Sequence, residues 1–456
     1  GSDDGLVHLT RDGGDSWNNI TPLQAPKFLM INSIETSFFK SGEAYIAGTS
    51  YKMGDFKPYL FKTNDYGKTW KKIVNGIKPE HFTRVLRSDP ARKGLLYAGT
   101  ESGLYVSYDD GESWSSFQKN LPIVPITDLT IKDNSLIVAT QGRGIWILDD
   151  LTVLHQINDS TVNNQINLFA PKDSYRMRGS GGKSSKTAGT NIENGVIVYY
   201  NIKNYDSSKD SISLSFSTSE GNLIKTFSNH DKVNILKVNK GSNKFVWDTK
   251  HDGAEILDGM IFWSASFSGA KSVPGEYLVT LIKNGVKKSQ PFKILIDPRS
   301  EVSVEEIQKQ LNFVNEVNKV VDQAHKAIKQ IREVNIKLKE FETNFKSSSS
   351  LTDLISTSKK IRNKLSEVEK NIYQTQNKSN QDPLNFPIKL TNKLGHLNRL
   401  VTLNDFAPTD QDNQVRIELT NKVEKELKIF KSLIDNEVKK FNQEFAKLKL
   451  DYLKIN

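Results

Sequence analysis

An eight-residue pattern occurs three times near the start of the chain and strongly limits what this part can fold into. The pattern is Ser/Thr-x-Asp-x-Gly-x-Ser/Thr-Trp, and its copies are box 1 (TRDGGDSW, 10–17), box 2 (TNDYGKTW, 63–70) and box 3 (SYDDGESW, 107–114). A short β-like run precedes each box, and a further apolar segment ending in small residues precedes boxes 2 and 3. A repeat of about 50 residues built in this way predicts four-stranded propeller blades, with a loop insertion at 51–58.

Every fixed position of the box has a role in folding a turn between two antiparallel strands. The aspartate accepts N–H bonds from its own turn, the glycine takes a positive φ, and the hydroxyl residues tie the ends together. The tryptophan leaves the turn and buries its ring. The expected structural positions are Thr10, Asp12, Gly14, Trp17, Thr63, Asp65, Gly67, Trp70, Ser107, Asp109, Gly111 and Trp114.

The alternative is that the three aspartates are catalytic acids or metal ligands. Repetition argues against this interpretation, because equivalent corners of separate blades do not converge on one substrate. We therefore expect no catalytic residue among the boxes.

The blade region, residues 1–155, is expected to be incomplete. Its last copy, ATQGRGIWILDD, keeps a strand but lacks the box, and the chain opens inside a blade. About three blades are fewer than the four to eight that usually close a ring. We expect the chain to be the C-terminal portion of a longer protein, whose N-terminal remainder supplies further blades and is the first partner.

Residues 156–300 are expected to form a linker and a β-sandwich. Period-two runs separated by turn residues predict the strands, and they suit an immunoglobulin or fibronectin type III sandwich. The Gly/Ser/Lys-rich stretch 172–195 is expected to be a loop. The predicted strands lie in NGVIVYYNIKN, SISLSFSTS, NKFVWDTK, MIFWSASFS, GEYLVTLIKNG and PFKILIDPR.

At residue 301 the period changes to that of helices. Ser303 and Glu306 fit a capping box, and the apolar residues after them recur at offsets of three and four. Further helices are expected from Thr352 to Tyr373, in LTNKLGHLNRLV and after DFAPTDQ. Short links imply an antiparallel four-helix bundle over 301–456. A coiled-coil seam for a partner is the alternative, which Asn335 at a seam position weakens.

Composition limits the function classes. The 456 residues contain no cysteine, which excludes disulfides and thiolate chemistry, and no apolar run long enough for a transmembrane segment. The formal net charge is +10, but the lysines are spread along the chain without a dense basic block. We interpret them as a solvated surface and expect no nucleic-acid partner.

The chain resembles a known family over nearly its whole length. Asp boxes are typical of sialidase-type and sortilin-like propellers, where they are structural. The segments GRGIWILDDLTVLHQI, LFAPKDSYRMRG, NKFVWD, PGEYLVTL and DFAPTD are similar to the C-terminal half of large bacterial proteins labelled BNR-repeat glycosyl hydrolase or sortilin-like. The resemblance implies a propeller end, a sandwich and a helical domain. Because the hydrolase label rests on the repeats, it does not by itself imply catalysis.

Few residues otherwise suggest chemistry. Arg143, between two glycines, is a candidate ligand contact, or it closes the last blade or pairs with Asp149 or Asp150. The seven histidines form no HExxH motif or close pair, so no metal is expected. The stretch GSGGKSS (179–185) lacks phosphate-loop spacing and is expected to be a linker.

These observations favour a multidomain, mainly β plus α protein without cofactors. We expect an exported bacterial protein, secreted, periplasmic or outer-membrane-associated, that binds an envelope protein or a glycan as a non-enzymatic scaffold. The alternative is a sialidase-like glycoside hydrolase with its catalytic residues in the missing N-terminal part. A third interpretation is an accessory protein of a peptidase.

Overall fold

The computed structural model describes residues 1–177 and 189–448 and combines several β-sheets with long α-helices. The chain divides into two compact units, Gly1–Asn164 and Gln165–Asn456. A mixed β and α fold was expected from the sequence. The finer domain boundaries, after residues 155 and 300, stay predictions.

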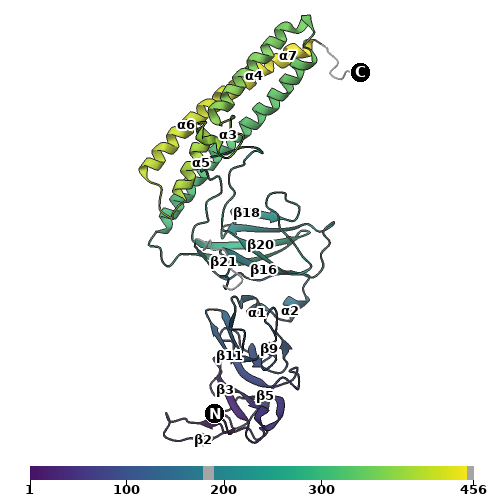
Figure 1. The fold of residues 1–456 in the computed structure, drawn as a ribbon, viewed down its shortest axis with the longest axis vertical. Coiled ribbons are helices and arrows are strands. Elements are labelled where there is room, and N and C mark those ends of the chain that lie inside the picture. The colour runs from purple at the N-terminus through teal and green to yellow at the C-terminus, as the bar shows by residue number, and fades with distance from the viewer. Residues whose placement is uncertain (178–188, 449–456) are drawn as a thin grey trace. The chain divides into compact units, whose positions relative to one another are not determined.

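The first unit, purple to blue in Figure 1, is a series of antiparallel meanders. Two of the meanders have four strands, in the orders β3-β4-β5-β6 and β7-β8-β9-β10, and we call each meander a blade. A two-stranded sheet precedes them and a three-stranded sheet comes after them. The elements are β1 (His8–Leu9), β2 (Asn18–Asn19), β3 (Met30–Thr36), β4 (Ala44–Ser50), the 3-10 turn η1 (Tyr51–Met53), β5 (Asp55–Thr63), β6 (Lys71–Lys72), β7 (Thr83–Ser88), β8 (Leu96–Thr100), β9 (Gly103–Ser107), β10 (Ser115–Ser116), β11 (Ile126–Lys132), β12 (Ser135–Thr140), β13 (Ile145–Leu148), α1 (Thr152–Gln156) and α2 (Asp159–Asn163).

The blades succeed one another around a common inner line. Their first strands β3, β7 and β11 lie side by side. An apolar core is packed between the β3–β6 and β7–β10 blades, and another between the β7–β10 blade and the β11–β13 sheet. This is the radial arrangement of propeller blades. Within residues 1–164, no strand pairing joins β13 to β1 or β2, so the described blades form an open arc.

The second unit begins with two sheets that share one core. A three-stranded sheet (β14-β16-β19) faces a five-stranded one (β15-β21-β20-β17-β18), and Trp247 stacks on Phe216 at 4.3 Å between ring centroids. The assignment of these two sheets to an immunoglobulin or fibronectin type III sandwich stays a prediction. The strands are β14 (Ile166–Leu168), β15 (Ser174–Arg176), β16 (Val196–Ile202), β17 (Ile212–Thr218), β18 (Leu223–Ser228), β19 (Gly241–Trp247), β20 (Gly275–Lys283) and β21 (Val286–Ile296).

The strand expected in MIFWSASFS (260–268) is wrong. This stretch has no regular structure and belongs to a segment, residues 254–268, that we call the clasp because it lies on the helices. Phe262 and Phe267 pack into the helical core. Asn392 replaces a neighbouring strand, since its Oδ1 accepts from the Trp263 N–H (2.7 Å) and its Nδ2 donates to the Trp263 carbonyl (2.8 Å). Apolar and polar residues do alternate in this stretch, but its apolar side chains pack on helices and not on a second sheet.

The helices, green to yellow in Figure 1, begin with the expected capping box, because Ser303 and Glu306 exchange hydrogen bonds. Helix α4 runs antiparallel to α3, since Arg332 meets Glu369 and Glu342 meets Arg362. The helices are α3 (Val304–Asn344), α4 (Thr352–Ile372), α5 (Leu390–Val401), α6 (Asp410–Ser432), the π-helical turn η4 (Leu433–Val438) and α7 (Lys439–Lys447), with 3-10 turns η2 (Ser349–Leu351) and η3 (Asp382–Leu384).

The expected four helices do not all lie side by side. Helix α5 is also antiparallel to α3 but meets its first half, where Asn398 bonds Asn318 (2.9 Å). Helices α4 and α5 therefore succeed one another along α3, and α6 to α7 form the third column (Figure 1). The reason is length, because α3 has 41 residues whereas α4 and α5 have 21 and 12.

Candidate functional site

Each box is a closed hydrogen-bonded turn. In box 3 the Ser107 hydroxyl donates to Asp109 (2.7 Å) and accepts from the Gly111 N–H (2.9 Å), while the Ser113 N–H donates to Asp109 (2.9 Å). Boxes 1 and 2 repeat these bonds. Bonds from the hydroxyl and N–H of Thr69 lower the pKa of Asp65 to about 2. Such carboxyl groups stay ionised and are poor proton donors near neutral pH.

The boxes also join successive blades. The Trp70 indole N–H donates to the Ile20 carbonyl (2.7 Å), and the Trp114 indole N–H donates to the Ile73 carbonyl (2.8 Å). In each case the acceptor belongs to the preceding blade. Trp17 differs, because it is 61% exposed and bonds Gly14 in its own box.

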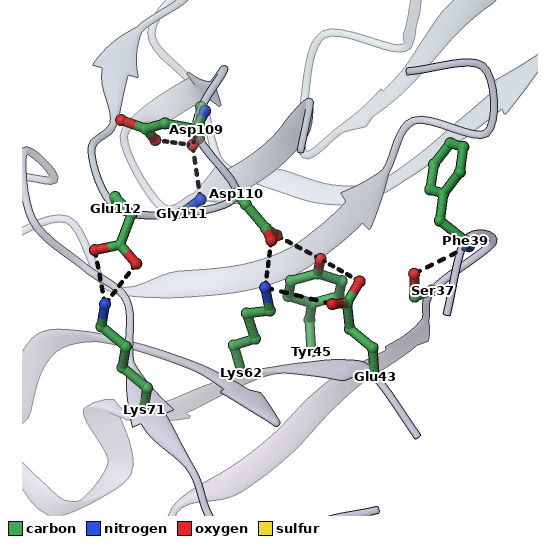
Figure 2. A network of polar contacts seen from close by, with 11 residues as sticks. Ser37, Phe39, Glu43, Tyr45, Lys62, Lys71, Asp109, Asp110, Gly111 and Glu112 are labelled. Atoms are coloured by element: carbon green, nitrogen blue, oxygen red, sulfur yellow. Dashed lines mark hydrogen bonds and ion pairs between the residues drawn. The ribbon is translucent and has the colours of Figure 1, made fainter. Parts of the chain in front are cut away.

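Figure 2 shows the polar network around box 3. Lys62 of β5 lies between Asp110 and Glu43, at 3.5 Å from Glu43 and closer to Asp110, and the Tyr45 hydroxyl lies 2.6 Å from Asp110. Burial raises the pKa of Tyr45 well above its usual range, and the bond to Asp110 adds to the effect. Glu112 also pairs with Lys71 of the preceding blade. The network is a joint between two blades, in which lysines offset the carboxylates.

The structure does not bring the three box aspartates together. Asp12, Asp65 and Asp109 each bond hydroxyl and N–H groups of their own box. The described residues hold no group of three or more acidic or histidine side chains that could bind a metal ion. In the same ranges, no helix is both long and apolar enough to cross a bilayer. The structural role of the boxes stays a prediction, and GSGGKSS lies outside the described residues.

Arg143 lies exposed in the loop between β12 and β13. Its guanidinium donates to the neighbouring Gly142 carbonyl (3.2 Å), and no ion pair to Asp149 or Asp150 is present among the described residues. A Cβ on Gly142 or Gly144 would meet no atom within 4 Å, so tight packing does not explain the glycines. Both have a positive φ, which glycine adopts without strain.

Sequence analysis missed a charged cluster on the inner strands. Arg87 of β7 reaches Ser33 of β3 (2.6 Å) and Asp128 of β11 (2.8 Å), and it lies 3.8 Å from Glu35. Burial raises the pKa of Glu35, although the Ser88 N–H and Arg87 oppose the shift. The available signal was the presence of two arginines, Arg84 and Arg87, in the first strand TRVLRS of a blade.

At the end opposite the boxes, loops of the first blades display apolar side chains. Phe28 is 62% exposed, Met53 60% and Phe56 53%. Phe28 has a φ of 61°, a conformation that is a genuine outlier for a bulky residue. A pocket of about 240 Å³ opens here, lined by Asp3, Asp4, Phe28, Met30, Thr49, Ser50, Lys52 and Met53.

No protein-family model matches the sequence. No curated protein shows significant similarity to it. Among solved structures, the chain is similar to YCF48 bound to D1 peptide, with 21% identity over 32% of this chain and 46% of that one and a TM-score of 0.26. YCF48 from Cyanidioschyzon merolae is 14% identical over 64% of this chain and 78% of that one, with a TM-score of 0.24. The GH74 xyloglucanase from Xanthomonas campestris is 13% identical over 64% of this chain and 42% of that one, with a TM-score of 0.26.

The chain thus spans less than half of the first of these proteins. Likenesses of this strength carry no argument about function. A function must instead be inferred from the blades and from the side chains that they expose.

Proposed function

We propose that this chain is part of a non-enzymatic, propeller-type binding protein of the bacterial envelope or exterior, of the BNR-repeat and sortilin-like kind. The observation that carries the proposal is the display of Phe28, Met53 and Phe56 at one end of the blades. Exposed apolar groups clustered in loops are typical of protein-binding surfaces. The boxes lie at the other end and use their polar groups within their own turns.

Further blades of the same protein are the first partner in this proposal. Trp70 and Trp114 each bond the preceding blade, whereas Trp17 is exposed. At the other side of the arc, Ile145 and Ile147 of β13 are 71% and 56% exposed. Both faces are suited to being covered by another blade, because exposed apolar side chains gathered on one face mark contact surfaces.

The proposed partner binding is tested by capture from an envelope fraction. The tagged chain is compared with a Phe28→Asn, Met53→Gln, Phe56→Ser variant and with a matched control, Leu223→Ser with Val233→Thr, which removes exposed apolar groups of the second unit. We expect the first variant to lose a partner that the control retains. Identical partners for all three proteins, together with no binding to a glycan array, would contradict the proposal.

A glycoside hydrolase is the second candidate, because two carboxyl groups flank Arg87 on the inner strands. Glu35 has a raised pKa, as a general acid requires, and Asp128 is an exposed carboxylate. This candidate predicts that the chain, with its remaining blades, releases sugar from an oligosaccharide panel. It also predicts that Glu35→Gln and Asp128→Asn abolish the release while Asp65→Asn does not.

A further inference from the structure

We propose that the pocket between residues 3–4 and η1 receives one basic side chain, lysine or arginine, from the partner protein. The proposal rests on the proposed binding function and names the chemistry of the contact. Its occupant is an extended segment of another protein that presents a cation on an aliphatic stem.

The size of the pocket favours a single side chain. Its volume is about 240 Å³, below the ~300–1,000 Å³ typical of small-molecule sites. Phe28, Met30 and Met53 supply apolar walls, with Phe28 and Met53 exposed at the rim. Such walls suit the methylene stem of lysine or arginine, and an aromatic face also attracts a cation.

The pocket also presents a polar group without a partner. Ser50 is only 3% exposed, yet its hydroxyl has no hydrogen-bond partner among the described residues. Its neighbour Thr49 is already bonded to Asn32 (2.9 Å). The Ser50 oxygen is not one of the fully buried unpaired atoms of the described residues, so it keeps access to the pocket and is available to accept a bond from a ligand N–H.

The charges at the rim select a cation. Asp3 and Asp4 contribute two carboxylates, whereas Lys52 is the only basic side chain in the lining. Asp4 accepts a bond from the Ser2 hydroxyl, an uncharged partner that leaves its negative charge unmatched. A charged N–H donor facing a carboxylate makes the stronger class of hydrogen bond.

The position of Phe28 is consistent with this role. Leu29 next to it is fully buried, while the Phe28 ring stands in solvent on a backbone of positive φ. In the free chain the Phe28 ring stays 62% exposed, so hydrophobic burial does not offset the strain of the backbone conformation. Contact with a ligand would offset it.

Methionine methyl NMR gives a direct test, because Met30 and Met53 line the pocket and the other two methionines, Met177 and Met260, lie in the second unit. The full chain, labelled at its methionine methyl groups, is titrated with the methylamides of N-acetyl-lysine and N-acetyl-arginine. We expect saturable shifts of Met30 and Met53 only. The norleucine and glutamate analogues should bind at least about tenfold more weakly, because they lack the cation.

Two variants test the charges. Asp3→Asn with Asp4→Asn should weaken lysine binding about tenfold, and Lys52→Glu should strengthen it by about twofold to fivefold. Equal binding of norleucine, unchanged affinity in the Asn variant or the absence of shifts would each overturn the proposal. If the Asn variant still captures the partner, the pocket proposal is wrong but the proposed function stands. If the methyl groups shift but no partner is captured, the proposed function is wrong but the pocket proposal stands.

Discussion

The indole N–H of Trp114 donates a 2.8 Å hydrogen bond to the carbonyl of Ile73, one blade earlier in the chain. The glycine of the same box lies against the same residue, because a Cβ on Gly111 would come within 2.7 Å of the Ile73 side chain. Box 2 repeats the arrangement, with Gly67 and Trp70 against Ile20. The box therefore acts twice, as a turn within one blade and as a contact with the blade before it.

Gly111→Ala should lower the stability of the blade region by about 2–5 kcal/mol, because it adds a clash with Ile73 to the strain of a positive φ. Gly14→Ala is the matched control. It has a φ of 112° but no atom within 4 Å of its Cβ, so only about 1–2 kcal/mol of strain is expected. Denaturant unfolding followed by tryptophan fluorescence measures both variants. Equal losses would show that the contact with Ile73 adds nothing.

Asp405→Asn should destabilise the second unit by about 3 kcal/mol, because it leaves the charge of the buried Arg176 without its ion pair. Adding Arg176→Met should restore part of the loss, since no unpaired charge remains. The surface pair Asp297–Arg299 serves as the comparison, and Asp297→Asn should have a much smaller effect. Calorimetry of the three variants measures these losses of stability. An Asp405→Asn variant as stable as the unchanged protein would contradict the prediction.

Gly395→Ala should destabilise the second unit even though alanine favours a helix by about 1 kcal/mol over glycine. A Cβ at this position of α5 would lie 2.6 Å from the Phe267 ring and 2.8 Å from Ala265, both in the clasp. We expect a net loss of about 1–3 kcal/mol. Hydrogen exchange of residues 254–268 should accelerate in this variant. Increased stability with unchanged exchange would mean that the clasp is not closely packed on α5.

The second unit should lose stability as the pH falls below about 6.5, because burial lowers the pKa of His325 from its usual value of 6.5. The unfolded chain then binds more protons than the folded one, so stability falls as pH drops from 6.5 to the folded pKa and levels off below it. His325 is fully buried, its Nδ1 lies 2.5 Å from the Glu255 carbonyl oxygen, and its ring packs on Phe262 and Phe267.

His325→Gln should flatten this pH dependence. His251, whose pKa burial also lowers, contributes in the same direction, so His251→Gln gives a parallel measurement. Asp322 and Arg332 also act electrostatically on His325 and are kept unchanged. Thermal stability between about pH 7.5 and 5 is the readout. An unchanged slope in His325→Gln would assign the effect to other groups.

The sequence by itself determined the elements whose contacts are local. The bonds within each box join residues at most four positions apart, as from Ser113 to Asp109, so an eight-residue pattern contains all of these internal bonds. The capping box at Ser303 spans three positions and was equally predictable. Other strands and helices follow their regular apolar period, whereas MIFWSASFS (260–268) has the period of a strand and forms none.

Only the tertiary structure decided which surfaces meet. Asn392 and Trp263 are 129 positions apart in the chain, and no local period indicates that a side-chain amide will replace a strand there. Arg87 meets Asp128 41 positions away, and the pocket near Phe28 joins residues from separate segments of the chain. Periodicity fixes which face of an element is apolar, but the partner of that face depends on packing the whole chain, and the functional surfaces are what the packing leaves exposed.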